Sequence, residues 1–140
     1  MREKMEVSMP TEIHQEVPFK AKPKDVYSVL MDTKKHTAFT KNGRAKISKK
    51  VGGAFTAHGG YILGVNLELV ENKRIVQSWR AKNWPKGVYS IVSFKIEKAG
   101  TGTKLTFDHT GLPEKEVAHL AEGWKKMYWD CMTEYFALVG

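Results

Sequence analysis

The amino-acid sequence predicts a single α+β domain in which a long C-terminal helix lies across an antiparallel sheet. Hydrophobic side chains recur at every second position through most of residues 44–110, as in strands with one buried face. Short turns, several of them rich in glycine, join these segments, and strands joined by short turns must be antiparallel. Residues 111–138 instead carry apolar side chains three or four positions apart, which is typical of a helix with one buried face.

The N-terminal part predicts one strand followed by two short helices. Residues 1–10 are expected to be a flexible segment, and residues 11–140 to form the domain. Residues 11–19 alternate as a first strand, and Pro23 opens a helix over residues 21–31. Asp32 and Thr33 are suited to cap a second helix, which ends near residue 40 and turns Phe39 inward.

The remaining strands complete a sheet of about six to seven strands. We expect them at residues 44–49, 54–58, 61–70, 74–80, 88–98 and 103–110. The helix over residues 111–138 is about 37 Å long at 1.5 Å per residue, which is enough to cross such a sheet. Its apolar stripe consists of Val117, Leu120, Trp124, Met127, Tyr128, Cys131, Tyr135 and Leu138.

The strand over residues 61–70 leaves two orientations open. One face carries Leu63, Val65 and Leu67, and the other carries Asn66 and Glu68. If the first face packs under the helix, the strand is an ordinary core strand. If the second does, the apolar residues form an exposed patch suited to dimerisation or partner docking.

The formal net charge of +8 favours either a solvated lysine-rich surface or a positive face that meets nucleic acid, an anionic membrane or an acidic protein. We predict no binding of nucleic acid, because no nucleic-acid-binding motif accompanies the lysines. The basic residues are Lys34, Lys35, Lys41, Arg44, Lys46, Lys49 and Lys50, with more at Lys82, Lys86, Lys95, Lys98 and Lys104.

Two further features indicate a cytoplasmic protein. The single Cys131 excludes an internal disulfide and fits a reducing compartment. The N-terminus has no apolar signal region, and no apolar run approaches the roughly 18 residues of a membrane span, so stable membrane insertion is not expected.

No catalytic constellation, metal site or cofactor site is predicted. The histidines lack metal-ligand spacing, and no Ser and Asp residues converge on a nucleophile arrangement. His109 shares strand parity with Leu105 and Phe107, so it should point toward the helix. It is then either a buried histidine held by a hydrogen bond, or a polar anchor and weak acid–base group inside a ligand cavity.

Two tryptophans lie outside the expected core pattern. Trp129 is roughly 130° from the centre of the helical stripe at 100° per residue. It either packs on the N-terminal helices or forms an aromatic contact edge for a partner, beside Lys125. Trp84, followed by Pro85 in a loop, presents the same choice, since exposed Trp is common at binding hot spots.

The motifs resemble one known family over nearly the whole chain from Thr11 onward. Those that carry the resemblance are Gly52-Gly53, Gly60 and Gly64, Trp79-Arg80, Trp84-Pro85, Gly87, His109, Pro113, Gly123-Trp124 and Tyr128-Trp129. This string resembles the C-terminal domain of the activator of the 90-kDa heat-shock chaperone's ATPase. That domain is similar to the helix-grip superfamily, which includes START lipid-transfer domains, polyketide cyclases and plant pathogenesis-related proteins.

The resemblance implies a START-like, helix-grip fold and a role in the stress response. The eukaryotic co-chaperone has a separate N-terminal domain that carries much of its contact with the chaperone, and this chain is too short to contain it. The resemblance therefore implies a standalone homolog of the second domain.

Two functional hypotheses follow. The first is a non-catalytic module, a monomer or weak dimer, that binds the chaperone or another acidic protein through Trp84, Pro85, Lys86 and Trp129. The second is a carrier of a small hydrophobic ligand such as a lipid or polyketide, or a weak cyclase-like enzyme, with a cavity under the C-terminal helix. The expected cavity lining is Trp79, Phe94, Phe107, His109, Trp124, Tyr128 and Met132.

Overall fold

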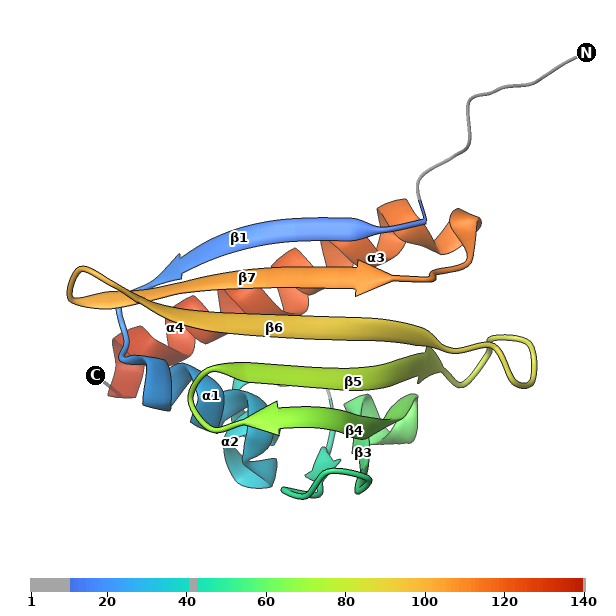
Figure 1. Ribbon diagram of the computed structural model, residues 1–140, viewed down its shortest axis with the longest axis horizontal. Coiled ribbons are helices and arrows are strands. Elements are labelled where there is room, and N and C mark those ends of the chain that lie inside the picture. The colour runs from blue at the N-terminus through green and yellow to red at the C-terminus, as the bar shows by residue number, and fades with distance from the viewer. Residues whose placement is uncertain (1–10, 41–42, 140) are drawn as a thin grey trace, which may run out of the picture.

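A seven-stranded antiparallel sheet with all helices on one face forms the domain (Figure 1). The computed structural model describes residues 11–40 and 43–139, so the segment expected to be flexible, residues 1–10, lies outside the described residues. The strands are β1 (Ile13–Phe19), β2 (Lys46–Ile47), β3 (Ala54–Ala57), β4 (Ile62–Val70), β5 (Arg74–Ala81), β6 (Ser90–Ala99) and β7 (Gly102–Thr110). Their spatial order is β1-β7-β6-β5-β4-β3-β2, and the predicted fold class is confirmed.

Two short helices follow β1, as predicted. Helix α1 (Pro23–Met31) begins at a proline, which has no N–H to leave unpaired in the first turn. Helix α2 (Thr33–Thr40) is capped by Asp32, whose Oδ1 accepts the backbone N–H of Lys35 at 3.0 Å. Phe39 on α2 is buried, so both helices close one end of the core.

The C-terminal helix contains a π-helical segment in its middle. A 3-10 turn, η2 (Glu114–Glu116), leads into α3 (Val117–Gly123), then the π segment η3 (Trp124–Trp129), then α4 (Asp130–Val139). A π-helix bonds residue i to i+5, whereas an α-helix bonds i to i+4, so the turn is wider. Trp124 and Trp129, five positions apart, therefore face the sheet together, with stacked rings 5.8 Å apart.

The prediction that Trp129 lies off the buried stripe is wrong for this reason. Its indole is only 4% exposed and packs edge-on against Phe107 and Phe19 of the sheet. The estimate of 100° per residue assumed regular α-helix through this turn. Trp129 therefore presents no exposed contact edge, because its ring packs against aromatic side chains of the sheet.

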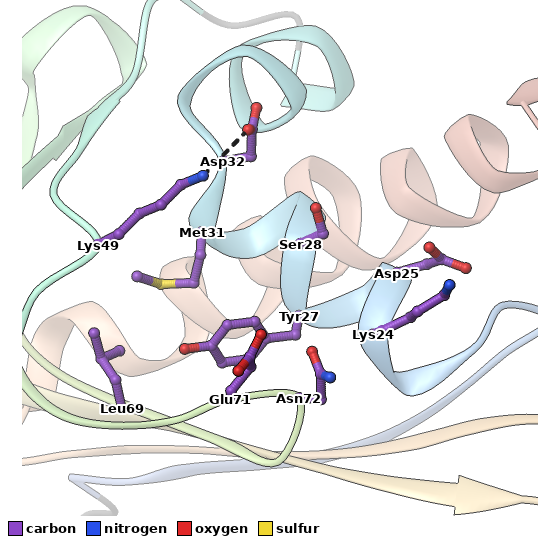
Figure 2. Close-up of a pocket in the computed structure, with 10 residues that line it drawn as sticks. All are labelled: Lys24, Asp25, Tyr27, Ser28, Met31, Asp32, Lys49, Leu69, Glu71 and Asn72. Atoms are coloured by element: carbon purple, nitrogen blue, oxygen red, sulfur yellow. Dashed lines mark ion pairs between the residues drawn. The ribbon is translucent and has the colours of Figure 1, made fainter.

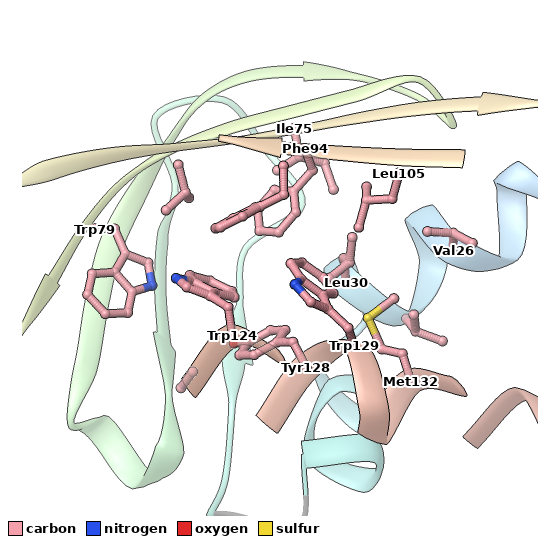
Figure 3. Packing of buried hydrophobic residues seen from close by; sticks show 14 of the residues in the cluster. Val26, Leu30, Ile75, Trp79, Phe94, Leu105, Trp124, Tyr128, Trp129 and Met132 are labelled. Carbon is pink, nitrogen blue, oxygen red and sulfur yellow. The ribbon is translucent and has the colours of Figure 1, made fainter. Parts of the chain in front are cut away.

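Aromatic side chains fill the space between sheet and helix (Figure 3). Trp79 and Phe94 extend from the strands, and Trp124, Tyr128 and Trp129 meet them from the helix. Ring centroids lie as close as 4.4 Å, between Phe107 and Trp124. Such edge-to-face and offset contacts strengthen a core beyond its buried area.

The structure shows which face of β4 points toward the helix. Ile62 and Asn66 are buried, whereas Leu63 and Val65 are half-buried on the opposite face of the sheet. The pairing with β5 shifts between Asn66 and Glu68, which marks a bulge. After the bulge Leu69 is the residue packed against the core. The apolar face of β4 therefore lies on the outer side of the sheet.

Candidate functional site

The residues expected to line a ligand cavity pack against one another in the core. All seven (Trp79, Phe94, Phe107, His109, Trp124, Tyr128 and Met132) are buried. The cavity that remains among Trp79, Phe94, Trp124 and Tyr128 has a volume of about 10 Å³. That is near the lower limit for one water molecule, whereas small-molecule pockets measure about 300–1,000 Å³.

His109 lies at the centre of a hydrogen-bonded chain that uses both ring nitrogens. The indole N–H of Trp124 donates to Nδ1 of His109 at 3.0 Å, so the ring proton resides on Nε2. Nε2 lies 2.7 Å from Ser90 Oγ, and that hydroxyl donates to the carbonyl of Trp79. Burial lowers the pKa of His109 to about 3. The ring is therefore a neutral structural link between β6, β7 and the helix, and not a free acid or base.

A second buried histidine, His36, takes part in a hydrogen bond that the sequence did not predict. His36 on α2 lies 2.9 Å from the hydroxyl of Tyr128, which is 92 positions away in the chain. Burial, and to a lesser extent the nearby His58, lower the pKa of His36 to about 3, and burial raises the pKa of Tyr128. His36 Nδ1 has no hydrogen-bond partner among the described residues. Only the folded chain brings these groups together, so no sequence motif could have revealed them.

The loop between β5 and β6 is organised by a buried arginine. The guanidinium of Arg80 donates to the carbonyl of Trp84 at 2.8 Å and to that of Pro85 at 3.1 Å. It also lies 5.4 Å from the ring centre of Tyr89, a cation–π contact. A planar guanidinium that holds several carbonyls fixes the loop in one conformation. In Figure 1 this loop extends beyond the sheet at the end opposite the C-terminus.

Trp84 is the internal anchor of that loop, which corrects the expectation that its side chain is exposed. Its indole is 5% exposed and packs at 60° against Trp79, with ring centres 5.5 Å apart. Pro85, Lys86 and Tyr89 are instead among the exposed residues of the loop, and Tyr89 is 50% exposed. Of the four predicted partner-binding residues, the structure places Pro85 and Lys86 at the surface, and Trp84 and Trp129 inside.

An apolar surface extends from the loop over the outer face of the sheet. Leu67 is 46% exposed, and Tyr61 and Ile91 are also exposed, beside half-buried Leu63 and Val65. The hydroxyl of Tyr61 donates to Asn83 Oδ1 at 2.8 Å, which ties this face to the loop. We call this region the docking surface; it comprises Tyr61, Leu63, Val65, Leu67, Pro85, Lys86, Tyr89 and Ile91.

A larger hollow lies between α1 and the β4–β5 turn (Figure 2). Its volume is about 640 Å³, and Tyr27, Met31 and Leu69 supply its apolar lining. Lys49 pairs with Asp32 at 3.7 Å across it. Burial, with the nearby Glu71, raises the pKa of Tyr27. Acidic and basic groups are mixed around its rim, so the hollow offers no preference for a ligand of one charge.

Among residues 11–40 and 43–139, no helix is long and apolar enough to cross a bilayer. Within the same ranges, no three His, Cys, Asp or Glu side chains converge as metal ligands.

Comparison with protein families gives one match over most of the chain. Residues 20–137 match the family described as Activator of Hsp90 ATPase homolog 1-like protein. The chain is 36% identical over 120 residues to "Activator of 90 kDa heat shock protein ATPase homolog" of Dictyostelium discoideum, covering 85% of this chain and 31% of that protein. It is 28% identical over 118 residues to "Activator of 90 kDa heat shock protein ATPase homolog 1" of Homo sapiens, covering 84% and 35%.

The chain thus spans about a third of the length of these curated relatives. Among solved structures, one described as an HSP90 activator from Plasmodium falciparum superposes with a TM-score of 0.86. It shares 21% sequence identity, and the alignment covers 91% of this chain and 97% of that one. At this identity the superposition shows a shared fold.

Proposed function

Because the chain belongs to the Activator of Hsp90 ATPase homolog 1-like family, we propose that it is a non-catalytic binding module for the 90-kDa heat-shock chaperone. The names of the curated relatives support this partner, as does the description of the Plasmodium structure. The match covers only a third of the relatives, so stimulation of the ATPase is a separate proposal. We expect binding to be the property that this domain carries by itself, in the cytoplasm.

The observation that carries the proposal is the preformed docking surface. Arg80 holds the loop by its carbonyls, so the backbone that carries Lys86 and Tyr89 needs little ordering when a partner binds. The adjoining outer face offers exposed Leu67 and Ile91, which lose contact with water on docking. Tyrosine, which Tyr89 and Tyr61 supply here, is enriched among the residues that dominate binding at the centres of protein interfaces.

The charge near the docking surface favours an acidic partner. Lys82 and Lys86 are both exposed on the loop, and no carboxylate of the described residues pairs with either. A basic rim around an apolar patch steers an acidic protein surface into place and sets its orientation.

Isothermal titration calorimetry with the purified chaperone tests the proposal. The double variant Leu67→Ser, Tyr89→Ala should weaken binding at least about tenfold, because it removes two of the most exposed apolar side chains of the surface. The matched control is Leu138→Ser, an exposed leucine near the end of α4 and far from the docking surface. We expect it to bind as the unaltered chain does. Absence of binding by the unaltered chain, or equal weakening by the control, would contradict the proposal.

The carrier or cyclase alternative is not favoured. The expected cavity residues fill the space under the helix, and His109 is neutral with both nitrogens engaged. A lipid-sized ligand would require the aromatic core to separate from the sheet.

A further inference from the structure

A second concave surface lies at the opposite end of the sheet from the docking surface. It is formed between α1 and α4, beside the β6–β7 turn, and has a volume of about 500 Å³. Val29, Tyr135, Phe136 and Val139 supply its apolar floor. Tyr135 and Phe136 are in edge-to-face contact, and Phe136 packs on Phe19, so the floor is continuous with the core.

Three lysines, Lys20, Lys22 and Lys35, form the rim of this groove, and all are exposed. None of their ammonium groups lies within 4 Å of a carboxylate in the described part of the chain. Asp25 is the acidic residue of the lining. Residues 20–35 hold five lysines and two aspartates, so the segment that forms the rim carries a net positive charge.

The backbone that carries this rim is held rigidly. Thr103 Oγ1 donates to the carbonyl of Ala21 at 2.6 Å, which fastens the β1–α1 connection to β7. The carbonyl of Lys22 accepts the N–H groups of Asp25 and Val26 at the start of α1. The Nζ of Lys35 donates to Ser28 Oγ at 2.9 Å, so this side chain is positioned over α1. The lysines are thus presented around a preformed apolar floor.

We propose that this lysine-rimmed groove binds an acidic peptide segment that carries an apolar side chain. The carboxylates of the peptide meet the three lysines, and its apolar side chain enters between α1 and α4. A small anion would make no contact with the apolar floor, and a neutral apolar ligand would gain nothing from the lysines of the rim. A membrane surface fits less well, because membrane-surface helices bury an outward apolar face in the bilayer interface, whereas here the apolar side chains form the floor of a groove. The proposal does not depend on the docking surface.

Fluorescence polarisation with a labelled peptide of glutamates and two leucines tests the proposal on the full chain. The variant Lys20→Glu, Lys22→Glu should weaken binding at least about tenfold, because like charges now face each other. The matched control, Lys46→Glu, Lys115→Glu, makes the same change in net charge at exposed residues outside the groove. It should leave the affinity within about twofold. Unfolding curves of both variants verify that they fold.

Two altered probes separate the contributions of charge and apolar contact. A peptide with both leucines replaced by serine should bind at least about tenfold more weakly, as should one with glutamine in place of glutamate. Equal weakening by the control variant would show mere charge attraction and overturn the proposal. Undiminished binding of the serine peptide would overturn it too. So would binding to phosphatidylserine vesicles without binding to the peptide, since a membrane would then be the partner.

Discussion

At the scale of single residues, the core depends on histidines that are neutral because they are buried. His109 accepts from one tryptophan and donates to a serine, and His36 pairs with Tyr128. The sequence predicted that His109 points inward, since strand parity is a local property. It could not predict the partners, because Trp124 and Ser90 reach His109 only when helix and sheet pack together.

Stability should therefore fall as the solution is acidified. Burial lowers the pKa of His36 and His109 from about 6.5 to about 3, so the unfolded chain binds more protons between these values. The free energy of unfolding should drop as pH falls below 6.5, by about 1.4 kcal/mol per pH unit for each ring that the unfolded chain protonates. Urea unfolding between pH 7 and 5 measures this slope.

The urea experiment is best carried out on the variant His14→Gln, so that His14 does not mask the effect of the buried histidines. Hydrogen bonds that the His14 ring donates to the carboxylates of Asp108 and Glu16 raise its pKa, so His14 makes the free energy of unfolding change with pH in the opposite direction. NMR ring signals of His36 and His109 should stay constant from pH 7 to 5. Titration of either ring near pH 6.5, or a flat stability profile, would contradict the assignment of these groups as neutral and buried.

Two tryptophan substitutions test the hydrogen bond to His109. Trp124→Phe removes the donor to Nδ1 and leaves that buried atom unpaired, which should cost about 1–3 kcal/mol beyond the lost packing. Trp84→Phe is the matched control, because the Nε1 of Trp84 has no partner among the described residues. Both free energies of unfolding come from urea titration. A larger loss for Trp84→Phe than for Trp124→Phe would show that the hydrogen bond adds little.

At the scale of elements, the spacing of hydrophobic residues along the sequence predicted the order of strands and helices. Boundaries were less predictable: the strand expected over residues 44–49 is reduced to Lys46–Ile47, because a strand needs a partner along its whole length. The π segment was not predicted, because the helical periodicity was taken as 100° per residue along the whole helix. The five-residue spacing of Trp124 and Trp129 was the available signal.

The π segment should tolerate removal of one residue. Deletion of exposed Lys126 would leave Trp129 four positions after Trp124, as in an α-helix, and would keep α4 in register with the core. Exposed Thr133 lies in the regular helix α4, where no wide turn can absorb a deletion, so its removal rotates Phe136 away from Phe19. We expect this second deletion to cost about 3 kcal/mol more than the first, as judged by thermal and urea unfolding. Equal costs would show that the wide turn does not absorb the change.

At the scale of the whole molecule, the two faces of the sheet have different roles. The inner face is closed by an aromatic core, whereas the outer face carries the apolar residues Leu63, Val65 and Ile91 beside a rigid loop. The sequence left both orientations of β4 open, because its alternation does not tell which face the helix covers. The bulge at residues 66–68 then places Leu69 on the inner face, opposite to Leu63 and Val65. The sequence also suggested the loop as a contact site, but with Trp84 outward. Only the structure shows that Arg80 draws the loop inward around that tryptophan.

If the outer face and its loop form the contact with the chaperone, chemical-shift mapping locates that contact residue by residue. The ¹⁵N-labelled chain is titrated with the unlabelled chaperone, and backbone signals are followed residue by residue. We predict that the largest changes occur at Leu63, Leu67, Lys86, Tyr89 and Ile91, while the signals of α3 and α4 change little. Changes confined to the helical face, or none at saturating chaperone, would contradict this placement of the contact.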